Sequence, residues 1–99
     1  MSVIGNFDIT LKSIRGKKQG GLYFKMEDEV LKGILDYEER LIDIEDLKVD
    51  GGKFTGSFPF KSALGDMQVM MKGVVEGDTV TGAVEAGIMK IKINGTRVE

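Results

Sequence analysis

The sequence predicts an all-β fold: an eight-stranded antiparallel up-and-down β-barrel, built as a meander of four hairpins with little or no helix. Apolar and polar residues alternate with a period of two along most of the chain, which is typical of half-buried strands. A short glycine-centred pattern recurs three times, and turn signals rich in Gly and Asp separate the alternating segments. With 99 residues, the chain is long enough for one domain, residues 1–99, and too short for two.

The repeat indicates hairpins in series. Its pattern is apolar, polar, Gly, any residue, apolar, and its glycines, at positions 33, 56 and 82, lie 23 and 26 residues apart. A second alternating segment follows each copy, so each repeat holds two strands. The N-terminal segment supplies the fourth hairpin, with residues 16–20 as its expected connecting loop. The expected strands are 4–14, 21–28, 30–37, 41–49, 53–61, 67–76, 79–85 and 88–98.

One segment also fits a helix by composition. Residues 26–47 are rich in Glu, Leu and Lys, and several of their apolar residues are spaced as on a helix. Gly33 interrupts that spacing, however, and Ile42-Asp43-Ile44 alternates. Because the repeat also includes this segment, we expect strands.

Closure of the sheet is favoured, because an open eight-stranded sheet would leave two edges and one uncovered apolar face. Five glycines share the parity of the apolar residues and therefore face inward, where missing bulk lets a strand bend sharply. Bulges are the alternative explanation for them. These glycines are Gly33, Gly56, Gly73, Gly82 and Gly95.

The two ends of the chain resemble those of lipocalins, a calycin-type barrel family. Gly5-Asn6-Phe7 and the terminal Thr96-Arg97 resemble the closure in which a Gly-x-Trp near the start packs its ring beside an arginine from the last strand. Here Phe7 replaces the tryptophan, and the resemblance implies that Arg97 lies over its ring as a cation–π pair that closes the barrel. The chain is shorter than a typical lipocalin and has no segment for the flanking helix.

The hairpin repeat, over nearly the whole chain, is also similar to glycine-punctuated β-modules of unassigned activity that are appended to bacterial hydrolases. Such a relation implies an accessory role beside a larger enzyme.

Composition excludes several classes of chemistry. The chain has no His and no Cys, which excludes zinc fingers, thiol nucleophiles, disulfides and Ser-His-Asp triads. A net charge of −2 argues against a nucleic-acid partner, and the basic run Arg15-Gly16-Lys17-Lys18 is interpreted as a solvated hairpin tip. No apolar run reaches the roughly 18 residues of a membrane span, so we expect no membrane partner and a cytoplasmic location. We expect no cofactor and no metal.

Catalysis by this chain would have to rest on carboxylates, Lys, Tyr, Ser or Thr, and an enzyme is only our third hypothesis. Leu47 and Val49 have the opposite parity to Ile42 and Ile44, which predicts a bulge near Glu45 or Asp46. Such a bulge would aim Asp46 inward. The alternative is that the acidic residues are solvated and keep the sheet soluble.

The first functional hypothesis is a non-catalytic barrel that binds a small apolar or amphipathic molecule in its interior. Tyr37 has inward parity beside a hairpin tip, and Arg40 follows that tip, so both could orient a ligand at the barrel mouth. Phe58, Met71 and Met89 are expected on the inner wall. Two alternatives stay open: Tyr37 could cap the core with its hydroxyl in solvent, and the interior could be filled by side chains.

The second hypothesis is an interaction module without a ligand of its own. Four apolar residues take the polar parity and would face solvent on an isolated barrel. If adjoining strands align them, they form an interface for a homodimer or for docking on a larger enzyme. They are Ile34, Met70, Val74 and Ala83.

Overall fold

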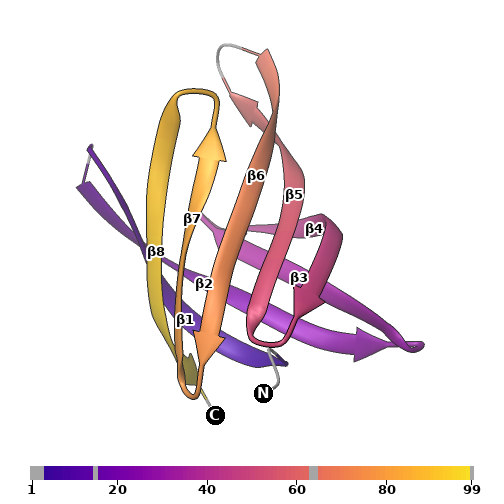
Figure 1. Cartoon of the computed structure of the whole chain (residues 1–99). Helices are drawn as coiled ribbons and strands as arrows, with labels where there is room; N and C mark the ends of the chain where they lie inside the picture. Colours follow the sequence, from indigo (N-terminus) through magenta and orange to yellow (C-terminus); the bar gives the residue numbers. More distant parts are fainter. Residues whose placement is uncertain (1–3, 15, 63–64, 99) are drawn as a thin grey trace.

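The computed structural model describes residues 4–14, 16–62 and 65–98 and folds them into a closed barrel of eight antiparallel strands (Figure 1). Each strand pairs with the next one along the chain, and the first pairs with the last, which confirms the predicted meander and its closure. No helix occurs among the described residues. The strands are β1 (Gly5–Ser13), β2 (Gly16–Glu27), β3 (Val30–Tyr37), β4 (Arg40–Asp50), β5 (Lys53–Ser62), β6 (Gly65–Glu76), β7 (Thr79–Ala86) and β8 (Met89–Val98).

The first hairpin differs from the sequence prediction. Residues 16–20, expected as a loop, form the first part of β2 and pair with β1 from Ser13 to Ile9. Gly16, Lys17 and Lys18 of the basic run therefore belong to a strand, so their interpretation as a hairpin tip was wrong. Arg15 lies outside the described residues. Gly20 is a strand glycine rather than a turn glycine, because a Cβ there would lie 2.5 Å from the carbonyl oxygen of Asp36 on β3.

Two kinds of tight turn occur among the five connections that the structure describes in full. The β2–β3 and β3–β4 turns each place two consecutive acidic residues in the left-handed region, at φ 51° and 66° in Asp28-Glu29 and 49° and 64° in Glu38-Glu39. This pattern is typical of type I′ hairpins. In the β4–β5, β6–β7 and β7–β8 turns a glycine takes the positive φ instead. The backbone of the two acidic turns is therefore strained, because residues with a side chain rarely adopt a positive φ. The glycine turns carry no such strain.

The predicted bulge is present, but its consequence for Asp46 is not the expected one. The register of β4 with β5 shifts between Glu45 and Lys48, and Asp46 has a φ of 51°. Asp46 is exposed, so the prediction of an inward carboxylate is wrong. The bulge turns Leu47 onto the core instead, where it packs against the buried cluster.

The inward glycines make room for rings and for neighbouring strands. A Cβ on Gly33 would lie 3.1 Å from the ring of Phe24, and one on Gly73 would lie 2.5 Å from the ring of Phe54. Gly73 also pairs directly with Gly82 on β7, so two strands approach there without side chains between them. Gly33 and Gly73 pair in continuous register, so they do not mark bulges, and a side chain at either position would collide with a core ring.

One end of the barrel is filled by aromatic rings. Phe7 and Phe24 meet edge to face with centroids 6.4 Å apart, and Phe24 meets Phe54 in the same way at 5.0 Å. All three rings are at most 2% exposed. The guanidinium of Arg97 lies over Phe7, 4.7 Å from the ring centroid, which is the contact that the resemblance to lipocalin closure implied.

Within the described ranges, no helix is long and apolar enough to cross a membrane.

Candidate ligand cavity

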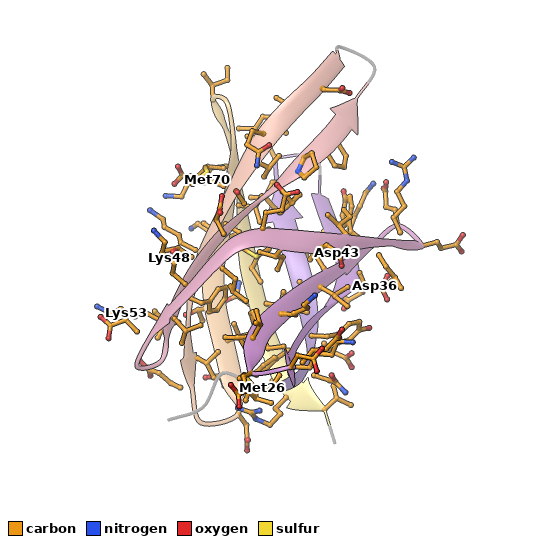
Figure 2. All side chains as sticks on the ribbon, turned by 90° about the vertical axis from the view of Figure 1, so that its right-hand side faces the viewer. Met26, Asp36, Asp43, Lys48, Lys53 and Met70 are labelled. Atoms are coloured by element: carbon orange, nitrogen blue, oxygen red, sulfur yellow. The ribbon has the colours of Figure 1, made fainter. Side chains whose placement is uncertain are left out.

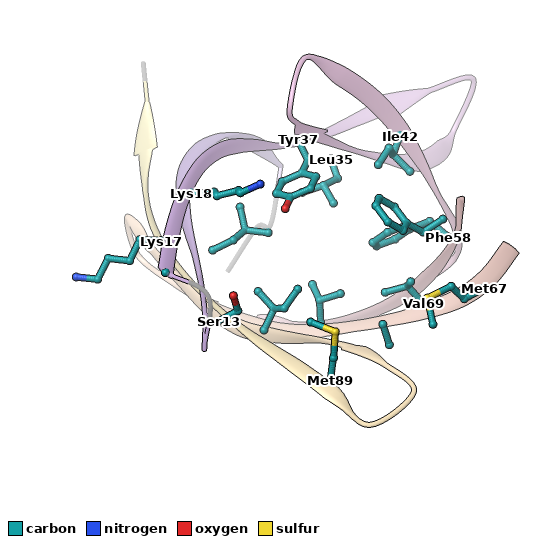
Figure 3. A pocket seen from close by; sticks show the side chains of 16 residues that line it. Ser13, Lys17, Lys18, Leu35, Tyr37, Ile42, Phe58, Met67, Val69 and Met89 are labelled. Atoms are coloured by element: carbon teal, nitrogen blue, oxygen red, sulfur yellow. The ribbon is translucent and has the colours of Figure 1, made fainter. Parts of the chain in front are cut away.

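The other end of the barrel is hollow. A cavity of about 570 Å³ opens there, within the range of roughly 300–1,000 Å³ that is usual for small-molecule sites (Figure 3). Most of its wall is apolar and comes from all the strands of the barrel. Its apolar lining includes Leu11, Leu35, Ile42, Phe58, Phe60, Val69, Val84 and Ile91.

Several inward residues near this end are small, and two long ones lie at the rim. Val69 and Val84 are small, Ala86 is smaller, and the rings of the aromatic cluster lie at the opposite end. At the rim, the thioethers of Met67 and Met89 are 38% and 42% exposed, so they border the opening rather than fill it. Flexible methionine side chains suit a wall that adapts to its ligand.

A few polar groups lie at the mouth. Figure 3 shows Tyr37 at the edge of the opening with its hydroxyl toward the cavity, and Lys18 beside it. Ser13 borders the same opening, while the side chain of Lys17 points away from it. An apolar wall with a few polar groups at one end is the usual form of a site that orients an amphipathic molecule.

Lys18 makes two contacts at the mouth. Its ammonium forms an ion pair with Glu38 and lies 5.6 Å from the centroid of the Tyr37 ring. The hydrogen bond to the Glu38 carboxylate, together with the nearby Tyr37, raises the pKa of Lys18 above its usual value. Lys18 is therefore a cation at neutral pH.

Lys18 faces inward although it lies in a polar stretch. It pairs with the buried Leu11 across β1–β2, and directly paired residues point to the same face of a sheet. Among the described residues that pair in the barrel, three charged side chains share this inward parity, and none is acidic. They are Lys18, Arg40 and Arg97, paired with Leu11, Tyr37 and Phe7.

The sequence did not single out Lys18, because residues 16–20 were expected to be a loop. The signal was available, however: Lys18, Leu22 and Phe24 share one parity, so extending the strand toward the N-terminus would have placed Lys18 on the inner face.

The predicted ligand-binding residues lie at three depths. Tyr37, Phe58 and Met89 line the cavity together. Met71 is 2% exposed and lies deeper, in the packed core. Arg40 is exposed at the rim, opposite Tyr37 in the register, and is not part of the cavity wall.

The predicted interface residues do not form one continuous patch. Met70 is 55% exposed on β6 with the half-buried Val74 on the same face, whereas Ile34 lies on β3 between Tyr23 and Asp43. Figure 2 shows Met70 and Asp43 on opposite sides of the view. Ala83 is 6% exposed and borders a shallow outer groove beside Val74.

Ile34 has a different outer environment from Met70. On the outer surface near Ile34, the Tyr23 hydroxyl donates a hydrogen bond to Asp36 at 3.2 Å. Burial and this acidic partner raise the pKa of Tyr23.

Acidic side chains do not converge in the part of the chain that the structure describes: no group of three or more Asp or Glu residues there could hold a metal ion.

Comparison with known proteins identifies the fold and no family. No family model matches the chain, and no curated protein matches its sequence. A redesigned β-barrel matches with a TM-score of 0.67 over 98% of this chain and 92% of its own, at 15% identity. A de novo designed fluorescence-activating β-barrel matches with a TM-score of 0.55 over 96% and 93%, at 12% identity. At such identities the likeness shows a small antiparallel barrel and nothing finer.

Proposed function

We propose that this chain is a non-catalytic, lipocalin-like barrel that binds one small apolar or amphipathic molecule in the open half of its interior. The observation that carries the proposal is the contrast between the two ends. One end is filled by edge-to-face aromatic rings, while the other holds a cavity of about 570 Å³ with a largely apolar wall.

Burial of an apolar ligand would supply the affinity. Each methylene that leaves water for an apolar site contributes about 0.8 kcal/mol before the cost of association is subtracted. No carboxylate is among the described residues that line the cavity, which favours binding over acid–base catalysis. The fold is shared with a designed barrel described as fluorescence-activating, which supports the proposal of an interior site.

A neutral, environment-sensitive dye such as Nile red tests the proposal. We expect saturable, one-to-one enhancement of its emission, which Ala86→Trp should abolish because the indole would enter the cavity from its rim. Thr81→Trp is the control, since it adds the same ring to the outer face of the same strand. Dye binding that Ala86→Trp leaves unchanged would contradict an interior site.

A second candidate function is an interaction module that docks through its outer face. It is favoured by the exposed Met70 and by the shallow outer groove that Val74 and Ala83 border. Sedimentation of the parent protein and of Met70→Glu tests the self-association form. A parent that is monomeric at all concentrations would rule that form out.

A further inference from the structure

The charges at the mouth carry an inference about the chemistry of the ligand, and this inference rests on the proposed function. Four polar residues border the cavity: Ser13, Lys17, Lys18 and Tyr37, of which two are cationic and none is anionic. Lys18 is the cation that shares the inward parity, and Figure 3 shows it beside the Tyr37 hydroxyl at the opening. A molecule whose body fills the apolar cavity would therefore end next to an ammonium and a phenol.

We propose that the ligand is an amphipathic anion: an apolar chain or ring with a carboxylate, sulfonate or phosphate head that lies against Lys18. The ammonium and the Tyr37 hydroxyl can both donate hydrogen bonds to such a head, and Ser13 offers a third hydroxyl. The apolar body then extends into the interior past Phe58 and Val84.

Glu38 does not prevent this arrangement. It pairs with Lys18 from a hairpin tip, and both side chains are about half exposed, at 56% for Lys18 and 51% for Glu38. An ion pair in such contact with water contributes little to stability, so a ligand head can take the place of the Glu38 carboxylate at low cost. Glu38 is also outside the cavity wall, whereas Lys18 belongs to it.

Arg40 strengthens the preference for an anion. It pairs with Tyr37 across β3–β4, so its inward parity places a second positive charge at the same rim. The acidic residues near this end lie off the inner face. Glu38 and Glu39 are exposed in the β3–β4 turn, and Asp66 and Glu85, next to Met67 and Ala86 of the cavity wall, have outward parity. Charge on the inner face of the mouth is thus positive, and charge on the outer tip is negative.

Three probes with one hydrophobic chain test the proposal: decanoate, decanol and decyltrimethylammonium, each kept below its micelle concentration. Displacement of bound Nile red at neutral pH and low salt measures their affinities. We expect decanoate to bind about five- to tenfold more tightly than the cation, a preference that shrinks as salt screens the mouth. Lys18→Met should remove most of this preference, and Glu38→Gln should increase it by freeing Lys18.

Lys25→Met is the matched control. Lys25 lies on the same strand, forms an ion pair with Glu27 at 3.3 Å, and the two side chains are 56% and 50% exposed. It faces away from the cavity, so its loss should leave the preference for decanoate unchanged.

The outcomes separate the two proposals. Equal binding of the three probes, or tighter binding of the cation, would overturn the anion proposal while the interior site stands. A charge preference that Lys25→Met removes as fully as Lys18→Met would also overturn it, because the effect would then be one of net charge. Failure of Nile red and of every probe to bind would overturn the interior site, and the anion proposal with it. Circular dichroism checks that Lys18→Met folds, and Glu38→Gln gives an independent reading if it does not.

Discussion

Arg97 offers the most direct test of what stabilises the closed end of the barrel. Its guanidinium lies over Phe7 and donates hydrogen bonds to the carbonyl oxygens of Ile4, at 2.5 Å, and Gly77, at 3.2 Å. It also forms an ion pair with Asp78 at 3.5 Å. These contacts join the last strand to the segment before β1 and to the β6–β7 turn. We predict that Arg97→Met, which keeps an apolar stem, destabilises the barrel substantially.

The magnitude follows from the exposure of each contact. The cation–π pair contributes about 0.5–1 kcal/mol. Each hydrogen bond from the charged group to a backbone carbonyl contributes about 1 kcal/mol in this half-buried setting. The ion pair adds little, because the Asp78 side chain is 87% exposed. The expected loss is therefore about 2–3 kcal/mol, a large part of the roughly 5–15 kcal/mol that stabilises most domains.

Urea unfolding followed by far-ultraviolet circular dichroism measures this loss, with an unchanged denaturant slope as the sign of two-state behaviour. Arg97→Lys keeps the charge but lacks the planar fork of donors, so we expect it to lose about half as much. Arg40→Met is the control, since Arg40 is an exposed arginine at the other end. A loss below about 0.5 kcal/mol for Arg97→Met, or an equal loss for Arg40→Met, would refute the reasoning.

Three further predictions concern strain and packing. Replacing Asp28-Glu29 by Asn-Gly should raise stability by about 1 kcal/mol, because both residues have positive φ; a lower urea midpoint would contradict this. Gly73→Ala should cost about 2–4 kcal/mol, because its Cβ would lie 2.5 Å from a buried phenyl ring; unchanged thermal unfolding would contradict it. Val84→Ile should stabilise by up to about 0.8 kcal/mol by extending into the cavity, whereas Val80→Ile, in the packed half, should destabilise by about 1–3 kcal/mol. Equal effects of the two substitutions would show that the halves do not differ in packing.

Much of the fold could be predicted from the sequence because a strand has a strict period of two. Alternation placed seven of the eight strands within a few residues of their observed bounds, and the parity change from Ile44 to Leu47 located the bulge. Pairing of neighbouring strands then left little freedom, since every turn is too short for a crossover.

Two sequence predictions were wrong: the length of the first hairpin loop and the direction of Asp46. Glycine marks turns, but Gly20 is required by a close approach between β2 and β3, so the first hairpin was drawn with too long a loop. Asp46 was placed on the wrong face for a related reason. A bulge shifts the parity of every residue that follows it on the strand, and the sequence alone did not show at which residue the shift begins. The shift buries the apolar Leu47 and leaves Asp46 exposed, which avoids the cost of an unpaired carboxylate in the core.

The cavity could not be predicted, because it depends on where the large inward residues fall along the barrel axis. Parity identifies the inner wall, and it correctly placed Phe58 there. It does not show that Phe54 packs edge to face with Phe24 at one end while Phe58 lines an open space. That distinction depends on the stagger between strands, which the local sequence does not encode.

The separation of the two ends has a consequence for how binding and stability are related. The aromatic cluster and the contacts of Arg97 lie at one end, and the cavity, Lys18 and Tyr37 lie at the other. A hollow interior costs stability because its lining atoms lack partners, so the closed end must offset that cost. A ligand would supply the missing contacts only at the open end. Binding should therefore raise the unfolding temperature of Arg97→Met by about as much as that of the parent protein, because the two contributions arise from separate groups of residues and add. Loss of ligand stabilisation in that variant would instead mean that closure of the barrel shapes the cavity.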